Sequence, residues 1–324
     1  MEPKRTFAGL GRVEAVRQLF EGTPYKPFAE PCFFASPDKE YITSSTRTLA
    51  EGVDFNLTYF PLKHLGYKAV CLVTGELYAV MSNPRTLGVV IGVSSKLDFE
   101  QISELWGGIV SGAGEYGYET LSLELKPSQN GLVISLNATG SEKQSTAAKR
   151  SVAQSKDLIC VSGSLGAAYL GQQVLEHKFG EIEKYRMFVG SYLHPEITPG
   201  LPAQLDTSGI YPSFGYFVTN GLSDALLRLC RDSGLGAKVY ADKIPFEGNS
   251  FSLGRELNID PVSAAMNGGD DCRLLFTIPI LGMEKFRHDF QTFDIIGHLA
   301  LPEVGAVLVT PDTLEHPVSA QGWN

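Results

Sequence analysis

The sequence has neither an excess of basic residues nor a hydrophobic run long enough to cross a membrane. Its 27 Lys and Arg residues are outnumbered by 36 Asp and Glu residues, which gives a formal net charge of -9. An acidic chain without a basic cluster has no electrostatic reason to bind nucleic acid or an anionic membrane. No window approaches 18 consecutive apolar residues, and residues 1–5 lead into no apolar signal segment. We therefore expect a soluble, cytoplasmic protein without nucleic-acid or membrane partners.

Paired cysteines are also absent. The five cysteines are scattered, odd in number and never form a C-x-x-C pair. Several stand in apolar strings, as Cys160 does within residues 158–161. This pattern is typical of small buried side chains in a reducing compartment and not of a disulfide framework or a zinc site.

The common catalytic signatures are missing too. The sequence contains no G-x-S-x-G string and no Walker phosphate-binding loop, and His64, His177 and His194 have no metal-ligand spacing. These histidines are interpreted as surface or hydrogen-bonded side chains. Any chemistry must therefore reside in less specific patterns.

What is present is enough apolar material for two domains. The chain has 324 residues, of which 43% are hydrophobic, so it can bury a sizeable core in two units of ordinary size. Residues 140–156 are polar and rich in Ser, Lys and Gln, as linkers between domains are. We expect an N-terminal domain over residues 1–145 and a C-terminal domain over residues 146–324.

Hydrophobic periodicity predicts a mixture of strands and helices. Asp98 and Gln101 have the spacing of a capping box at the start of a helix, which Gly112, Gly114 and Gly117 are expected to end. The apolar run at residues 67–81 fits either a strand or a buried helix. Strands are expected at residues 40–48, 87–93, 120–125, 132–138, 158–161, 273–278, 293–297 and 306–310. Further helices are expected at residues 1–20, 165–177 and 222–232.

Two glycine-containing segments are candidate binding loops. Residues 161–166 read as a strand, a Ser162-Gly163-Ser164 turn and a helix start, where backbone N–H groups can bind an anion. The alternative is a plain glycine turn with Ser164 as the helix cap. Residues 267–271 place two glycines before Asp270 and Asp271, which suits a hard cation or a substrate hydrogen bond, or simply a tight turn with exposed acids.

A third candidate lies at the end of an expected strand. Thr46, Arg47 and Thr48 combine hydroxyl groups with a guanidinium, which suits a phosphate group, and Asp54 follows closely. The alternative is a solvated strand end. Trp323, one of two tryptophans, serves either as a packing anchor or as a stacking face for a flat ligand.

The order of these segments resembles the bacterial thiamine-monophosphate kinases. Residues 51–55 and 61–69 are similar to the "EGVHF…PLKHLGYKA" segment of that family, and residues 157–169, 267–277 and 320–323 follow in the same order. The resemblance covers nearly the whole chain. It implies an α+β, two-domain fold of the aminoimidazole-ribonucleotide-synthetase type, with an N-terminal sheet that dimerises and an α+β C-terminal domain beside it.

The family transfers a phosphoryl group from ATP to thiamine monophosphate and holds magnesium with aspartates. The resemblance therefore implies Mg²⁺ and ATP as cofactors and a homodimer. By alignment, Asn220 and Gly221 fall on the catalytic "SDG" motif. Phosphate-binding positions fall on Thr46, Arg47, Thr48, Arg150, Gly163 and Ser164. Substrate-binding positions fall on Asp54, Asp270, Asp271 and Trp323, and metal-binding positions fall on Glu30, Glu76 and Glu124.

Six of the family's acidic motifs are altered in this chain. "GDDAA" becomes residues 29–32 with only Glu30 acidic, "STDT" becomes residues 45–48 with Arg47, and "LSD" becomes residues 74–76 with Glu76. "GGDT" becomes residues 122–125 with Glu124. In the "SGD" motif, Ser164 replaces the aspartate, and in the "SDG" motif, Asn220 replaces it. Both motifs therefore lose their charge.

These losses bear on the reaction because phosphoryl transfer depends on positioned magnesium, and magnesium is held by carboxylates and phosphates. A cation at position 47 repels the metal. Our leading expectation is a catalytically impaired or inactive member that still binds a phosphorylated ligand through Arg47. The alternatives are an active kinase rebuilt around Glu30, Glu76, Glu124, Asp270 and Asp271, or a regulatory subunit that pairs with an intact kinase.

Overall fold

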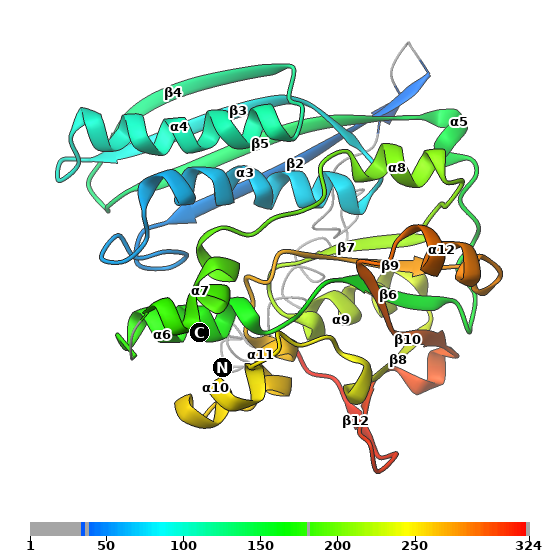
Figure 1. Ribbon diagram of the computed structural model, residues 1–324. Coiled ribbons are helices and arrows are strands. Elements are labelled where there is room, and N and C mark those ends of the chain that lie inside the picture. The colour runs from blue at the N-terminus through cyan, green and yellow to red at the C-terminus, as the bar shows by residue number, and fades with distance from the viewer. Residues whose placement is uncertain (1–33, 36–38, 180–181, 322–324) are drawn as a thin grey trace, which may run out of the picture.

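The computed structural model describes residues 34–35, 39–179 and 182–321, so the expected helix at residues 1–20, Glu30 and Trp323 lie outside the described residues. The chain forms two β-sheets with helices between and around them, as Figure 1 shows. The expected α+β class is confirmed. Among the described residues, no helix is both long and apolar enough to span a lipid bilayer.

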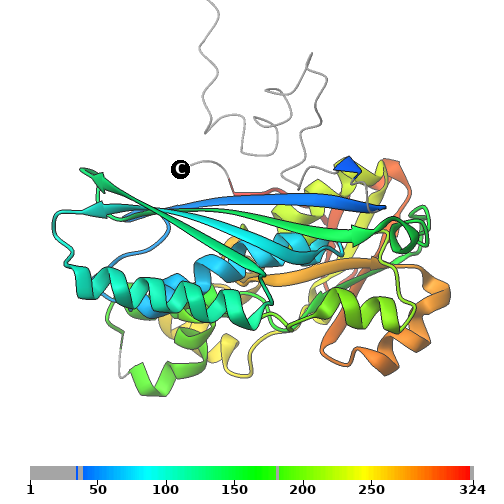
Figure 2. The same cartoon turned by 90° about the horizontal axis from the view of Figure 1, so that it is seen from above.

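The first sheet has five strands in the order β1-β2-β5-β3-β4. Their bounds are Phe34–Ala35 (β1), Glu40–Ala50 (β2), Asn83–Ser94 (β3), Thr120–Ser128 (β4) and Val133–Lys143 (β5). β2 and β3 pair antiparallel with β5, and β4 runs parallel to β3 at the edge. All four strands expected in this part of the sequence are present. Helices α3 and α4 lie on one side of this sheet, as Figure 2 shows.

Helix α3 (Leu62–Ala79) resolves the ambiguity of the apolar run at residues 67–81. Fifteen of its 18 residues are buried, which explains the lack of a clean period, because a helix that is enclosed on all sides needs no polar face. On its second side it meets the second sheet so closely that a Cβ on Gly215 would lie 1.9 Å from the carbonyl oxygen of Ala79. The two sheets are thus packed on one helix.

Helix α4 (Phe99–Glu115) begins with the expected capping box. Asp98 accepts from the backbone N–H of Gln101, and the Gln101 side chain accepts from the backbone N–H of Asp98. The expectation that Gly112 and Gly114 end the helix was wrong, since both lie within it and only Gly117, with a φ of +77°, follows its end. Gly112 is buried against the side chain of Val70, so it provides close helix contact rather than a stop.

The second sheet has seven strands in the order β12-β11-β8-β10-β6-β9-β7. Their bounds are Leu158–Ser162 (β6), Phe214–Val218 (β7), Gly236–Tyr240 (β8), Arg273–Ile278 (β9), Phe293–Ala300 (β10), Ala306–Val309 (β11) and Glu315–Pro317 (β12). The remaining α-helices are Gln144–Ala147 (α5), Ala167–Glu176 (α6), Arg186–Leu193 (α7), Leu201–Thr207 (α8), Leu222–Ser233 (α9), Ser250–Leu257 (α10), Pro261–Asn267 (α11) and Met283–Asp289 (α12). Four of these strands and helices α6 and α9 were expected, whereas short β7, β8 and β12 were not.

Two hydrophobic clusters sit on the two faces of this second sheet. Apolar residues of α9, such as Leu226, pack with Ile159 and Tyr216 on one face. On the other face, Phe286 of α12 packs on Phe276 and Phe293, and this cluster continues through α3 into the first sheet. The two sheets therefore share one core.

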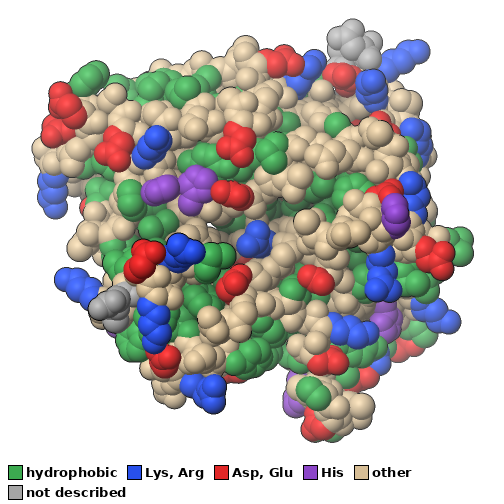
Figure 3. Space-filling view, viewed as in Figure 1, with side chains coloured by type: hydrophobic (Ala, Val, Ile, Leu, Met, Phe, Trp, Pro, Cys, Tyr) green, Lys and Arg blue, Asp and Glu red, His purple; other side chains and the backbone are tan. Residues whose placement is uncertain are grey.

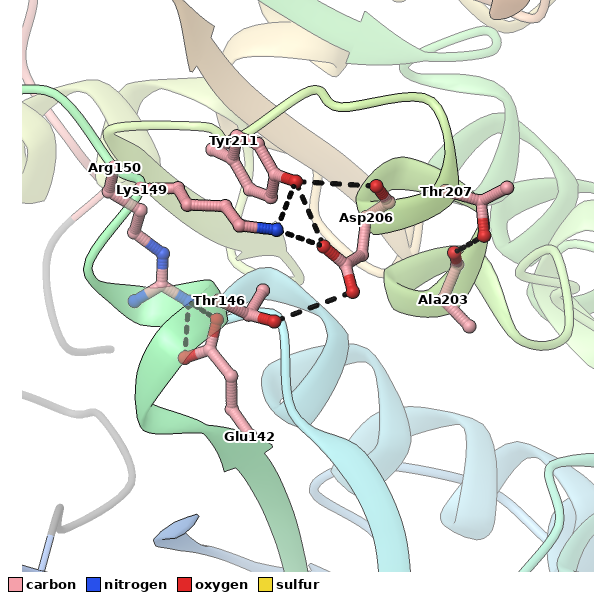
Figure 4. A network of polar contacts seen from close by, with 8 residues as sticks. All are labelled: Glu142, Thr146, Lys149, Arg150, Ala203, Asp206, Thr207 and Tyr211. Carbon is pink, nitrogen blue, oxygen red and sulfur yellow. Dashed lines mark hydrogen bonds and ion pairs between the residues drawn. The ribbon is translucent and has the colours of Figure 1, made fainter. Parts of the chain in front are cut away.

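The segment that joins the sheets is shorter than expected. β5 runs to Lys143 and α5 follows at once, so residues 140–147 belong to regular structure and not to a linker. After α5, neighbouring charged residues tie the connection to both halves, as Figure 4 shows. Arg150 donates to both carboxylate oxygens of Glu142 at 2.6 and 2.7 Å and to the carbonyl of Val80. Lys149 donates to Asp206, which places α8 beside the connection.

Glu142 is almost fully buried in this network. Burial raises the pKa of its carboxyl group to about 7, and the Arg150 guanidinium opposes that rise. Arg150 therefore compensates a buried acid at the junction, and its guanidinium is committed to that contact. The domain division at residues 145 and 146 stays a prediction.

Candidate functional site

A cavity of about 420 Å³ lies where β2, α3 and the loops around α9 and α11 meet. Four residues singled out from the sequence line it, namely Arg47, Asp54, Asn220 and Asp270. The rest of its wall is formed by Leu49, Val53, Leu65, Lys68, Leu72, Gln172, Thr219, Asp224, Asn267, Gly268, Gly269, Ala320 and Gln321. Segments that are 170 or more residues apart in the sequence thus form one site between the two sheets.

Arg47 reaches this cavity from β2, a strand in the first sheet. Its Nη2 donates to the hydroxyl oxygen of Thr219, which follows β7 in the second sheet, at 2.9 Å. Among the described residues, only Thr219 accepts a hydrogen bond from this guanidinium. Its other N–H donors are therefore available to an anionic ligand in the cavity.

Thr46 and Thr48 do not join Arg47. Successive side chains of a strand point to opposite faces of the sheet, and both threonines are exposed on the face away from Arg47. Thr46 accepts from Asn137, and Thr48 is hydrogen bonded to Ser135 on the neighbouring strand. The expectation that these hydroxyls contact the same phosphate as Arg47 was wrong because adjacent strand residues cannot share a face.

Lys68 is a central residue of the site that the sequence did not reveal. It lies on α3 with only 3% of its side chain exposed, and its Nζ is 3.1 Å from Asp270 Oδ2 and 3.0 Å from the carbonyl oxygen of Tyr192. The Nζ also lies 4.0 Å from the centre of the Tyr192 ring. A lone lysine within a long apolar run was the available signal, since a buried lysine must have a partner.

Asp54 lies at the rim of the cavity, where one carboxylate oxygen accepts from the backbone N–H of Ala50 at 2.8 Å. Partial desolvation raises the pKa of Asp54, and nearby Asp270 adds to the rise. Arg47 and Lys68 act in the opposite direction. These four charged groups therefore lie close enough to influence one another.

The turn that carries Asn220 and Gly221 packs directly against the loop that carries Asp270. A Cβ on Gly221, whose φ is +88°, would lie 2.4 Å from the carbonyl oxygen of Met266, so no other residue fits there. The backbone N–H of Asp270 donates to the carbonyl oxygen of Thr219 at 2.9 Å. Asp270 itself adopts a φ of +62°, and this contact holds that unusual backbone in place.

Asp271 lies next to Asp270 in sequence but serves another purpose. Its two carboxylate oxygens accept from the backbone N–H groups of Gly166 at 2.8 Å and Ala168 at 3.3 Å, which satisfies the first turn of α6. Burial raises its pKa to about 7, although both hydrogen bonds lower it. Asp271 therefore caps α6 and does not line the cavity.

Several other expected site residues lie elsewhere. Ser164 precedes α6 without capping it, since the residue before the helix is Gly166, and the carbonyl oxygen of Ser164 accepts from Arg273. Gly163 lies beside the same arginine. Glu124 is exposed on edge strand β4 and pairs with Lys126. Glu76 lies on α3 without lining the cavity, and Arg150 is in the junction described above.

Two of the three carboxylates that line the cavity are paired with cations, and the third, Asp54, accepts from a backbone N–H. Lys68 pairs with Asp270, and Arg228 pairs with Asp224 at 3.0 Å. In the described ranges, no group of three or more Asp, Glu, His or Cys side chains is arranged to hold a metal ion. Since magnesium needs oxygen ligands that are not already neutralised, the described side chains do not fit a resident Mg²⁺.

Thiamine-monophosphate kinases align with this sequence over most of its length. A thiamine-monophosphate kinase of Pyrococcus horikoshii is 27% identical over 264 residues, which cover 80% of this chain and 78% of that protein. The Bacillus subtilis enzyme of the same name is 26% identical over 287 residues, or 86% of each chain. The chain is therefore similar to thiamine-monophosphate kinases over most of its length. No protein-family model matches the chain.

Solved structures of two kinds of protein share the fold. AaThiL complexed with AMPPCP and TMP superimposes on all of this chain with a TM-score of 0.84 at 20% identity, covering 99% of the known structure. The hydrogenase maturation protein HypE in complex with ATP matches 88% of the chain with a TM-score of 0.64 at 17% identity, covering 85% of the known structure. The expected synthetase-like fold is thus confirmed.

Proposed function

We propose that this chain binds a phosphorylated ligand of the thiamine monophosphate type in the cavity at Arg47 and transfers phosphate from ATP poorly or not at all. The observation that carries the proposal is Arg47 itself, which extends from β2 into the cavity at a position where the resemblance to the "STDT" motif implies an acid. A guanidinium can bind a phosphate group through several N–H donors without a metal. Similarity to thiamine-monophosphate kinases supports the ligand class, and the AMPPCP and TMP complex of a structural neighbour supports ATP as a second ligand.

The loss of activity follows from charge. Phosphoryl transfer is accelerated mainly by positioned cations that neutralise the transferring group. Arg47 supplies one positive charge but holds it in a fixed place on β2, tied to Thr219. Asp270 and Asp224 are already neutralised by Lys68 and Arg228, so among the described residues Asp54 is the one cavity carboxylate without an ion-pair partner that could help to bring in magnesium.

We expect purified protein with ATP, magnesium and thiamine monophosphate to form no thiamine diphosphate above background. Calorimetry without magnesium should detect thiamine monophosphate binding, and Arg47→Ala should weaken it at least tenfold, because one charge-assisted phosphate contact contributes about 1.5–3 kcal/mol. Arg85→Ala is the matched control, since Arg85 lies exposed on β3 and pairs with Glu119 outside the cavity.

Two results would count against this proposal. Turnover near one per second, within the ordinary range of kinases, would refute the impaired activity. Unchanged binding in Arg47→Ala would refute the role of the guanidinium while leaving the activity measurement intact.

We also propose that the first sheet pairs with that of a second copy along the β4 edge. β4 is nine residues long and mostly exposed, and it carries Leu123 and Leu125 with 40% and 53% of their surfaces exposed. An exposed apolar edge strand is a ready surface for pairing with another chain. Light scattering should give the mass of a dimer for the unmodified chain and of a monomer for Leu123→Lys/Leu125→Lys. Leu281→Lys, which changes a leucine that is 98% exposed on the second half, should leave the dimer intact.

A further inference from the structure

A second and larger cavity, of about 830 Å³, lies on the second sheet away from the Arg47 site. It opens beside α12, on the sheet face that carries Phe276 and Phe293, where α12 covers only part of the strands. The residues that line it are Lys156, Leu158, Tyr240, Lys243, Ile280, Met283, Arg287, Gln291, Phe293, Asp294, Ile295, Gly297 and His298. On the right of Figure 3, below α12, side chains of Lys, Arg and His gather over β8 and β10.

A β-bulge in β10 places His298 in this cavity. Ile295 lies opposite Cys160 of β6, whereas Gly297 lies opposite Ile159, so two steps along β10 match one step along β6. Without the extra residue, His298 would face α9 on the other side of the sheet. With it, His298 lies opposite Leu158 and shares a face with Phe293 and Ile295. Bulges that redirect a side chain in this way are common beside functional sites.

The neighbouring strand completes the wall. His298 lies opposite Lys238 of β8, and Tyr240, two residues further along, occupies the same face. The ring centres of Tyr240 and His298 are 5.8 Å apart, and Lys243 Nζ lies 4.7 Å from the Tyr240 ring centre. An aromatic surface and a cation are thus presented together.

The charge of this cavity is opposite to that of the whole protein. Lys156, Lys243 and Arg287 line it against a single carboxylate, Asp294, although the chain carries a net charge of -9. In the part of the chain that the structure describes, none of these three cations forms an ion pair, whereas neighbouring Lys238 pairs with Glu315 and neighbouring Lys285 pairs with Asp289. The cations at the cavity are the ones left to meet an external anion.

We propose that this cavity binds a small organic phosphate with a flat ring, the class to which nucleoside monophosphates belong. The phosphate group is bound by Lys243 and Arg287, with Lys156 as a third cation in the same cavity, and the ring packs on Tyr240 beside Leu158 and Phe293. Clustered cations favour a dianion, and the aromatic surface favours a planar body. The site is independent of the proposed function at Arg47.

His298 provides a local reporter for the test. Burial lowers the pKa of His298, and Lys238 and Lys243 lower it further, so an anion that binds beside it should raise that pKa. In full-length protein with isotope-labelled histidine, the His298 signal is assigned with His298→Gln. AMP at millimolar concentration should shift the signal and raise the pH midpoint of its titration. Adenosine should have little effect, and inorganic phosphate should have a weaker one.

Two variants distinguish a built site from a general attraction to cations. Lys243→Gln/Arg287→Gln should weaken AMP binding at His298 at least tenfold, and both residues are exposed, so the fold is retained. Lys285→Gln removes a cation from the same helix outside the cavity and should leave the effect unchanged. The proposal is overturned if AMP leaves the His298 signal in place, if adenosine acts as strongly as AMP, or if the double variant responds like the unmodified chain.

Discussion

Gly108→Ala is expected to lower the free energy of unfolding by about 3 kcal/mol, although alanine normally favours a helix over glycine. Helices α3 and α4 cross with their backbones in contact at this point. A Cβ on Gly108 would lie 2.0 Å from the carbonyl oxygen of Lys63, and one on Gly66 would lie 2.1 Å from that of Leu105. Backbone atoms cannot turn aside as a side chain can, so the helices must separate and loosen the shared core.

Gly107 offers a control one residue away. A Cβ there would meet nothing within 4 Å, so Gly107→Ala should stabilise the protein by about 0.5–1 kcal/mol. Urea unfolding of the two variants should therefore give changes of opposite sign. A stabilising Gly108→Ala would show that the helices do not approach this closely.

Asp271→Asn is expected to remove a pH dependence of about 3 kcal/mol between pH 4.5 and pH 8. Burial raises the pKa of Asp271 to about 7 in the folded protein, against 3.8 for the free side chain. A carboxyl group with a raised pKa stabilises the fold most below its unfolded pKa, and this contribution is lost as the pH rises through 7. Asparagine keeps an oxygen for the N–H of Gly166 and does not titrate.

The measurement is the difference in unfolding free energy between the unmodified protein and Asp271→Asn at several pH values. The unmodified chain should lose stability relative to the variant as the pH increases. Asp289→Asn is a control that should stay flat over this range, because His288 and Lys285 lower the pKa of Asp289 below the 3.8 of the free side chain. A difference that stays flat between pH 4.5 and pH 8 would mean that Asp271 remains ionised throughout.

The elements predicted best from the sequence are those in which one local signal was enough. The capping box at Asp98, the strand at residues 87–93 and the helix at residues 222–232 all follow from neighbouring residues. The apolar run at residues 67–81 could not be assigned, because a helix buried between two sheets has no exposed face. The five-residue strands β7 and β8 were also missed, because each contains a glycine and lacks the unbroken apolar string of β6, which is equally short.

The candidate site was predicted in part for a similar reason. Resemblance to known motifs brought Arg47, Asp54, Asn220 and Asp270 to attention, and the structure places them around one cavity. The resemblance could not show that Thr48 lies on the face of β2 opposite Arg47, because a motif match does not take account of the alternation of side chains along a strand. Nor could it separate adjacent Asp270 and Asp271, whose different partners come from α3 and α6, far away in sequence.

The position of α3 has a consequence for synthesis on the ribosome. Its second side packs on β7 and β9, and 135 residues separate Ala79 from Phe214 (214 − 79). At about 5–20 residues per second, this leaves the apolar helix without its partner for roughly 7–27 s. Throughout that interval the nascent chain exposes a surface that chaperones bind, so the yield of folded protein depends on elongation rate as well as on final stability.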